Sequence, residues 1–468
     1  MEATRRLTLR LYGLTALVAV ASFWAQLPGL IGSGGIWPAA LALDSQRAGG
    51  AAVLEVPTLA WLSSSDLMLH ALCAAGCLAS VLVAALVRPR LALVVLYVSW
   101  LSLIHVGGPF LAFQWDILLA ESALALIPFA GPFPRPWARA LVAFLAVKVT
   151  LSSGLVKLLS GDESWRDLTA LTYHWWTQPL PTWSSVLLAR LPLWAQQGLC
   201  GAMFMLELGA PVLALGPRRA RLASAAGMIA LQVGLFAAGN YSYFNVLTAA
   251  LCLPLLDDRA LAALRLWPVA PAQPRPPGRA VDVAGWALAA AMILWSALAF
   301  TGRLSAAPRP VLSALERLHP FLLNSGYGAF AVMTKTRPEI VLEGSRDGVE
   351  WTPYEFPWKP GALTRRPAFV APLQPRLDWQ MWFAALGDCG GNPWLVRAQQ
   401  RLLEGAPEVE GLFASVPPNH PNFLRTRVFE YRFAPPGSPA WWTRTETGPY
   451  CPVVTLDPQG RLVRAQLP

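Results

Sequence analysis

The chain has 468 residues, of which 55% are hydrophobic and 14% are charged, and its mean hydropathy is +0.43. Soluble globular proteins carry about 25% charged residues, so the composition excludes an ordinary soluble fold for most of the chain. The formal net charge of +10 lies largely in short loops between apolar runs. This distribution indicates membrane topology and argues against a nucleic-acid partner.

Nine apolar stretches come close to the length of about 20 residues that a membrane-spanning helix needs. They cover residues 11–27, 67–87, 91–106, 114–130, 137–159, 195–215, 220–238, 243–256 and 283–300. The first stretch is not followed by a small-residue cleavage site, so it is predicted to be a retained span and not a signal peptide. Residues 1–302 are therefore predicted to form an α-helical polytopic membrane bundle of about nine spans, embedded in membrane lipid.

Basic residues alternate between the loops on the two sides of the predicted spans. One set of loops carries Arg5, Arg6, Arg10, Arg88, Arg90, Arg135, Arg139, Arg218, Arg219, Arg221, Arg259, Arg265, Arg275 and Arg279. The other set carries only Arg47, Arg166 and Arg190. Because Lys and Arg accumulate in cytoplasmic loops, the first set is predicted to be cytoplasmic. An odd number of spans then places the C-terminus outside the cytosol.

Residues 303–468 are predicted to form a β-rich, extracytoplasmic soluble domain. Segments 340–345 and 351–356 flank Asp347-Gly348, a sequence typical of a hairpin turn. Residues 427–433 alternate like a further strand, and 392–404 have the pattern of a short helix. Cys389 and Cys451 both fall on the oxidising side, where they either form a disulfide or remain free.

Ionisable residues inside predicted spans are costly and are therefore candidates for function. These residues are His105, Asp116, Glu121, Lys148, Lys157 and Glu207, and the pocket candidates among them are Asp116, Glu121, Lys148 and Lys157. One interpretation is a structural ion-pair network in which the lysines pair with the two carboxylates. The alternative is a binding or catalytic pocket in which burial turns a lysine into a base. The sequence leaves both open, although the structural interpretation is favoured.

The segment 160–183 is rich in Trp and polar residues and contains His174, the residue there that ordinarily titrates near neutral pH. It is either an interfacial aromatic belt or a lid over the bundle that meets a client. Asn240, just after the predicted span 220–238, is a further candidate for the polar pocket. No Gly-x-Ser-x-Gly motif, phosphate loop or metal-ligand spacing occurs in the sequence, so neither lipase activity nor a metal or other cofactor is predicted, and no residue is assigned as catalytic.

The predicted soluble domain contains a dense group of aromatic and charged residues. Its members are Arg376, Asp378, Trp379, Trp382, Trp441 and Trp442. Exposed Trp and Arg dominate protein interfaces, so these residues are candidates for client binding. The alternative is that an Arg376–Asp378 ion pair beneath the Trp rings stabilises the core.

The chain resembles the lipase maturation factor family over nearly its whole length. The resemblance lies in 29–32, 35–39, 114–116 with Glu121, 153–157, 167–171, 173–174, 178–181, 239–241, 244–245, 257–258, 324–328, 333–337, 343–348 and, the longest, Gln374–Leu386. Animal members are endoplasmic-reticulum membrane proteins that secreted lipases need in order to reach an active fold, and their lumenal C-terminal region contacts the client.

The resemblance implies a membrane-anchored, chaperone-like maturation factor whose partner is a secreted lipase-type protein. The membrane would be that of the endoplasmic reticulum in a eukaryote, or the inner membrane in a bacterium, which the Arg-rich and Ala-rich composition suggests. The alternative is a membrane-embedded enzyme acting on a lipid or exported protein, distantly like vitamin K-dependent carboxylase-type membrane proteins. An enzyme would depend on one polar side chain, such as that of Lys157, whereas a chaperone would depend on an extended surface.

Overall fold

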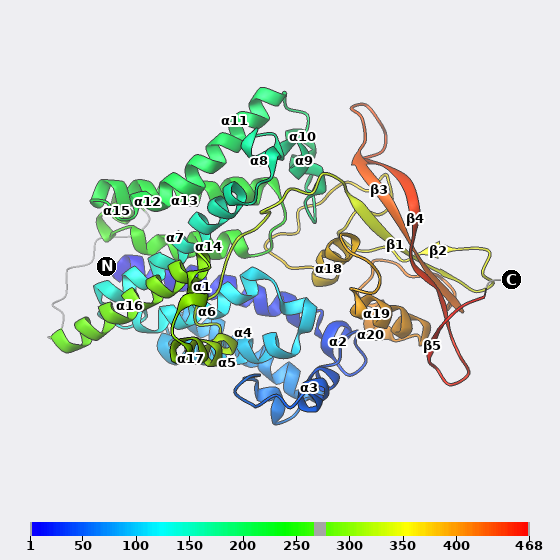
Figure 1. Cartoon of the computed structure of the whole chain (residues 1–468), viewed down its shortest axis with the longest axis horizontal. Helices are drawn as coiled ribbons and strands as arrows, with labels where there is room; N and C mark the ends of the chain where they lie inside the picture. The colour runs from blue at the N-terminus through cyan, green and yellow to red at the C-terminus, as the bar shows by residue number, and fades with distance from the viewer. Residues whose placement is uncertain (1, 266–277, 467–468) are drawn as a thin grey trace.

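The computed structural model describes residues 2–265 and 278–466, and Arg275 lies outside this range. The N-terminal part is helical and the C-terminal part contains the sheet (Figure 1). The bundle contains α1 (Glu2–Trp24), α2 (Leu27–Ile31), α3 (Ala39–Ala48), α4 (Asp66–Ala84), α5 (Pro89–Val106), α6 (Gln114–Phe129), α7 (Pro136–Leu159), α8 (Glu163–Arg166), α9 (Ala170–Thr177), α10 (Trp183–Leu188), α11 (Leu193–Phe204), the π-helical turn η3 (Met205–Gly209), α12 (Ala210–Leu213), α13 (Arg218–Ala238), α14 (Phe244–Cys252), η4 (Leu253–Leu255), α15 (Asp258–Ala263) and α16 (Arg279–Phe300).

Six helices in the described residues are long and apolar enough to cross a membrane: α1, α4, α5, α7, α13 and α16. The other three predicted spans are also helical, but α6 has 16 residues, η3 interrupts the helix between α11 and α12, and α14 with η4 spans only Phe244–Leu255. The predicted count of nine spans is therefore not confirmed. Gly and Pro residues shorten these stretches because they disturb or end the apolar helix.

Close helix packing in the bundle depends on small residues, as expected where both helix and lipid are apolar. At Gly13 of α1, an added Cβ would lie 2.7 Å from the carbonyl oxygen of Ser80 and 2.6 Å from the amide nitrogen of Ala84, both on α4. The opposite extreme is α16, which exposes Val281, Trp286, Ile293 and Leu294. Exposed apolar side chains on this scale suit contact with lipid.

The C-terminal part continues with α17 (Arg309–Leu318) and a connecting segment, residues 319–337, which runs along the bundle before the sheet begins. We call residues 338–466 the sheet domain. It contains β1 (Pro338–Ser345), β2 (Thr352–Pro353), α18 (Arg376–Ala385), α19 (Pro393–Leu403), α20 (Pro407–Glu410), β3 (Phe423–Phe433), β4 (Trp442–Leu456) and β5 (Leu462–Arg464). The antiparallel strand order is β2-β1-β3-β4-β5.

The predicted hairpin is confirmed, and its turn shows why Asp-Gly occurs there. Gly348 has φ +78°, which a glycine adopts without strain. The Asp347 carboxylate accepts hydrogen bonds from the amides of Val349 and Glu350 at 2.8 and 2.9 Å. The predicted strand and helix near 427–433 and 392–404 correspond to β3 and α19. One face of the sheet packs on α18 and α19, and the other faces away from the bundle (Figure 1).

Candidate functional site

A buried ion pair joins the bundle to the sheet domain. The guanidinium of Arg376, at the start of α18, donates to both carboxylate oxygens of Asp116 on α6, each at 2.8 Å. Neither side chain is exposed. The hydroxyl of Tyr243 donates to Asp116 Oδ1 at 2.5 Å, and Arg376 also donates to the carbonyl of Phe110 at 2.6 Å. A bidentate pair of this kind fixes orientation as well as distance.

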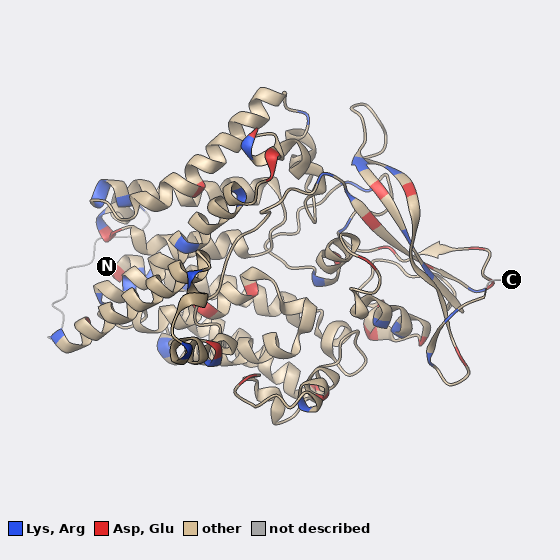
Figure 2. Cartoon of the chain, in the orientation of Figure 1, with Lys and Arg blue, Asp and Glu red and all other residues tan. Residues whose placement is uncertain are grey.

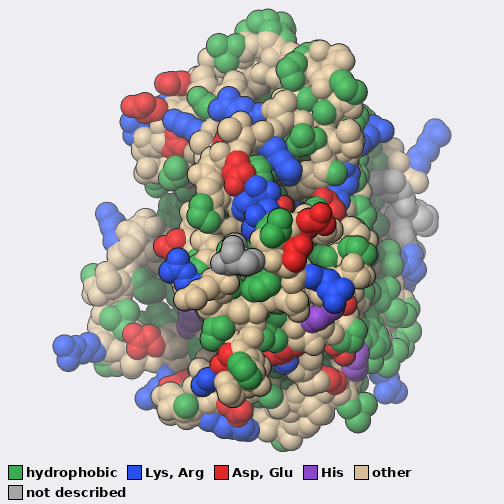
Figure 3. Space-filling view, turned by 90° about the vertical axis from the view of Figure 1, so that its right-hand side faces the viewer, with side chains coloured by type: hydrophobic (Ala, Val, Ile, Leu, Met, Phe, Trp, Pro, Cys, Tyr) green, Lys and Arg blue, Asp and Glu red, His purple; other side chains and the backbone are tan. Residues whose placement is uncertain are grey.

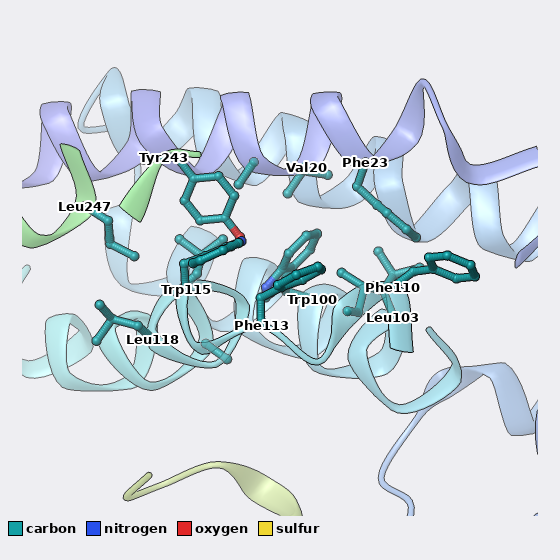
Figure 4. Close-up of a cluster of buried hydrophobic side chains, with 14 of the residues drawn as sticks. Val20, Phe23, Trp100, Leu103, Phe110, Phe113, Trp115, Leu118, Tyr243 and Leu247 are labelled. Atoms are coloured by element: carbon teal, nitrogen blue, oxygen red, sulfur yellow. The ribbon is translucent and has the colours of Figure 1, made fainter. Parts of the chain in front are cut away.

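Aromatic rings surround this ion pair and exclude water from it. The centre of the Arg376 guanidinium lies 5.1 Å from the ring of Phe23 and 5.8 Å from the ring of Trp100. Figure 4 shows Phe23 on α1, Trp100 on α5 and Phe113 just before α6 within one cluster. The predicted Arg376–Asp378 pair is therefore wrong, because Arg376 pairs with a residue 260 positions away.

Asp378 instead organises the loop that precedes α18. Its Oδ1 accepts the amides of Trp358 and Lys359, both at 2.8 Å. Burial raises the pKa of Asp378 to about 6, although these two amides and the nearby Lys359 lower it in part. The carboxyl group is thus held in the interior by backbone donors and not by a cation.

A second buried cluster holds the connecting segment inside the bundle. Lys148 on α7 donates to Glu121 on α6 at 2.7 Å and to the amide oxygen of Asn324 at 2.8 Å. The other oxygen of Glu121 accepts a hydrogen bond from the hydroxyl of Tyr327 and one from the amide of Ser325 at 3.3 Å. The pairing of Lys148 with Glu121 agrees with the structural interpretation of the sequence.

Lys157 does not pair with Asp116 or Glu121. Its ammonium donates to Glu207 at 2.6 Å, with both side chains buried. Glu207 lies in η3 (Met205–Gly209), the π-helical turn, a feature that is frequent at functional sites. Its second oxygen, Oε2, has no hydrogen-bond partner among the described residues. The sequence marks Glu207 as an ionisable residue within a predicted span, but nothing in its local sequence shows which lysine it meets.

The segment 160–183 is covered by the C-terminal part of the chain. The guanidinium of Arg337 donates to the carbonyls of Trp176 at 2.8 Å, Gln178 and Pro179 at 2.9 Å. It also pairs with Glu339 at 2.7 Å. The indole of Trp382 donates to the carbonyl of Thr177 at 2.8 Å. Arg337 is a contact residue that the sequence analysis did not single out, although it ends one of the matching stretches.

His174 and Asn240 lie close to this covered segment. The His174 ring shares a 2.6 Å hydrogen bond with the hydroxyl of Tyr241. Burial lowers the pKa of His174 to about 3, with a smaller effect from the Lys157 ammonium. The prediction that this residue titrates near neutral pH is therefore wrong. Asn240 donates to the carbonyls of Leu180 and Ala368 and accepts the amides of Val370 and Ala371. It therefore fastens the loop 368–371 to the bundle.

Most of the client-binding candidates lie in the interior. Arg376, Asp378, Trp379, Trp382 and Trp442 are all at most 7% exposed. Contact with a client requires exposure, so in this conformation these five residues do not form a client surface. Trp441 is partly exposed and remains a candidate. A disulfide joins Cys389, after α18, to Cys451 on β4, with the Cα atoms 5.4 Å apart.

A cavity of about 1140 Å³ lies beneath α18, in the half of the bundle next to the sheet domain. Its walls come from α7, α9, α10, α11, α13, α14, residues 328–334 and α18, and most of the lining side chains are apolar. Lys157, Glu207 and His174 lie in its wall, whereas Lys148 and Asp116 do not. The predicted polar candidates thus divide between the contacts of the two parts of the chain and the wall of this cavity.

Comparison with known proteins agrees with this two-part organisation. The model of the lipase maturation factor transmembrane domain matches residues 3–263, and that of the lipase maturation factor C-terminal domain matches residues 322–452. The chain belongs to the lipase maturation factor family. It is 32% identical to lipase maturation factor 2 of Mus musculus, over 94% of this chain and 81% of the relative.

Other lipase maturation factors are similar over comparable lengths. Identity is 32% to factor 2 of Homo sapiens, covering 97% of this chain and 82% of the relative. Identity to lipase maturation factor 1 of Bos taurus is 30%, covering 99% of this chain and 91% of the relative. No solved structure matches the chain. The match to the C-terminal domain of the family begins at residue 322, within the connecting segment that contacts the bundle.

Proposed function

We propose that this lipase maturation factor is anchored in a membrane and helps exported lipases reach their active form, using its sheet domain outside the cytosol. The observation that carries the proposal is that both family domains are present and are fastened together by the buried Asp116–Arg376 pair. Bundle and sheet domain then act as one body at the membrane surface. A client that emerges from the membrane would meet the domain at a fixed height and orientation.

The arrangement of charges supports the extracytoplasmic position of the sheet domain. At one end of α1, the amide of Thr4 donates to Asp258 at 3.1 Å. At the other end, the side-chain Nε2 of Gln26 donates to the carbonyl of Gln374 at 2.7 Å. Basic loop residues gather at the first end, opposite the sheet (Figure 2). The positive-inside rule makes that end cytoplasmic.

We propose that α6, α11–α12 and α14 complete a set of nine crossings. The start of α6 meets the sheet domain through Asp116, and just after its end the carbonyl of Ala130 accepts Arg5 at 3.1 Å. α14 begins beside Trp115, and the carbonyl of Pro254 beyond its end accepts Arg139 at 2.5 Å. Both short helices thus run between the same two ends as α1. The disulfide at Cys389 and Cys451 supports an oxidising compartment for the sheet domain.

We propose that the client approaches the outer sheet face, the face that α18, α19 and the bundle leave uncovered. Glu343 there pairs with Arg425 at 2.7 Å and with Arg427 at 2.9 Å. Arg425 lies over the ring of Trp351 at 4.2 Å. Figure 3 shows mixed basic and acidic side chains on this side of the molecule. Such a surface favours specific, reversible association over permanent hydrophobic docking.

The test is the specific activity of secreted lipases, measured per molecule of secreted antigen, in cells with and without this gene. We expect specific activity to fall without the gene and to return on re-expression. Glu446→Arg, at an exposed position of β4 on the same face as Arg427, should restore less activity than the matched variant Glu316→Arg, an exposed residue of α17. Unchanged specific activity on deletion would exclude the proposed function, and equal rescue by both variants would exclude the outer sheet face.

A further inference from the structure

The cavity beneath α18 is large for a space that lies inside a single chain. Ligand pockets usually enclose about 300–1000 Å³, and this one encloses about 1140 Å³. Its apolar walls include Leu171, Leu206, Leu231, Phe330 and Phe383. The cavity is partly open to the surface of the bundle, and apolar lining atoms gain van der Waals contacts when an apolar group fills it.

Several buried polar atoms of the cavity wall have no hydrogen-bond partner among the described residues. They are the acceptors Glu207 Oε2 and Asn245 Oδ1, the donors Trp115 Nε1 and Trp379 Nε1, and His174 Nδ1. Each of these side chains is at most 8% exposed. An unpartnered buried polar group is unfavourable, so these atoms indicate a ligand that both donates and accepts hydrogen bonds.

The charge of the wall favours a neutral ligand. Lys157 and Glu207 are the charged residues that line the cavity in the described part of the chain. They pair with each other at 2.6 Å, so each charge is already neutralised and neither is available to balance a charge on a ligand. A phosphate or carboxylate head would lose its hydration without gaining a counter-charge, whereas hydroxyl and ester groups meet the donors and acceptors already present.

The cavity reaches the surface of the bundle that would face lipid. Leu199 and Ala202 on α11 and Ala230 and Gly234 on α13 line it and are exposed. α12 packs closely against α13, whereas α11 makes few contacts with α13. α11 and α13 therefore separate toward the sheet domain. Small residues at this separation leave room for a chain to enter from the side.

We propose that the cavity binds a neutral amphiphile with a long apolar chain and an uncharged head bearing hydroxyl or ester groups, taken laterally from the adjacent leaflet. The chain would occupy the space between α11, α13 and α14. The head would lie near Glu207 and Asn245. Trp379 and Phe383 of α18 form part of the cover, which connects occupancy to the seating of the sheet domain. This proposal does not depend on the identity of the client.

Two glycines provide a matched pair for testing it. Gly234 lines the cavity and Gly198 does not. Both lie within helices, and an added Cβ at either would meet nothing within 4 Å. Gly234→Phe should therefore fill the cavity without disturbing the fold, and Gly198→Phe should add the same side chain to α11 outside it.

The measurement is photolabelling of the purified full-length protein in nanodiscs by a diazirine-bearing monoacylglycerol. Gly234→Phe should reduce labelling about tenfold, which corresponds to roughly 1.4 kcal/mol, and Gly198→Phe should leave it unchanged. Unlabelled monoolein should compete better than oleate or phosphatidylglycerol. Equal labelling of both variants, or better competition by the anionic lipids, would overturn the proposal, as would exclusive competition by an apolar peptide. Lipase activity is not part of this assay, so its outcome is separate from that of the maturation role.

Discussion

Buried carboxylates occur both in the contacts that hold the C-terminal part of the chain on the bundle and in the cavity wall, and they differ in whether both carboxylate oxygens have partners. In the interdomain contacts, both oxygens of Asp116 and both oxygens of Glu121 have partners. In the cavity wall, Glu207 uses one oxygen for Lys157 and leaves the other unpartnered among the described residues. Ion pairs with every oxygen occupied suit a structural role, whereas an incomplete pair beside a large space suits ligand binding. Substitutions in these contacts test this distinction.

The largest effect is expected from breaking the Asp116–Arg376 pair. Arg376→Met leaves a buried carboxylate without its cation, which typically costs about 3–5 kcal/mol. We expect a large loss of thermal stability of the purified protein in detergent. Asp116→Leu should cost a similar amount.

The double variant Asp116→Leu/Arg376→Met is the control for this prediction. It removes both charges, so it should recover much of the stability lost in either single variant. If the double variant is as unstable as the sum of the two single variants, the two side chains act independently and the pair does not fasten the domains.

A smaller effect is expected at the connecting segment, where two tyrosine hydroxyls can be compared. Tyr327 donates to the Glu121 carboxylate, and Tyr97 donates to the carbonyl of Phe321 at 2.6 Å. Bonds to charged groups are worth about 1.5–3 kcal/mol and neutral ones about 0.5–1.5 kcal/mol. Tyr327→Phe should therefore lower the unfolding free energy more than Tyr97→Phe. Limited proteolysis should also show faster cleavage within 319–337 in Tyr327→Phe, and identical cleavage of the two variants would count against the role of Glu121.

The sequence predicts the parts of the fold that depend on local pattern. Long apolar runs identify α1, α4, α5, α7, α13 and α16 because lipid demands about 20 consecutive apolar residues. The Asp347-Gly348 turn is equally local, since a positive φ and an acceptor side chain define it. The short helices α6 and α14 have a weaker signal because they gain their stability from packing against other helices.

The partners of the polar site residues are not predictable in the same way. Arg376 and Asp116 are 260 positions apart, and nothing near either residue distinguishes its partner from Asp378 or Lys157. Tryptophan occurs both in protein interfaces and in cores, so the sequence does not show which of these Trp379 and Trp382 belong to. The cavity is a property of how six or more segments pack, so only the structure reveals it.

The smallest expected effect is a pH dependence at Asp378. The pKa of this buried carboxyl is raised to about 6 from its ordinary 3.8, so the folded protein holds the proton more tightly than the unfolded chain. Its contribution to stability is therefore fully present below pH 3.8 and is lost as pH rises through about 6, by roughly 2–3 kcal/mol at most. Asp378→Asn keeps an oxygen for the amides of Trp358 and Lys359 but does not titrate. Between pH 4 and 6, the stability of the unaltered protein should fall relative to this variant as pH rises.

Asp347 gives a control of opposite sign for the titration of Asp378. Hydrogen bonds from the amides of Val349 and Glu350, and from the hydroxyl of Ser345, lower the pKa of this exposed carboxyl. Its contribution is fully present above pH 3.8 and is lost as pH falls below that value, so comparison of the unaltered protein with Asp347→Asn should show the reverse trend below about pH 4. Thermal unfolding between about pH 2.5 and 6 measures both differences. A difference between the unaltered protein and Asp378→Asn that does not change with pH would mean that the carboxyl at 378 is already ionised at pH 4, as an exposed group would be, and that its burial beneath the sheet does not control its charge.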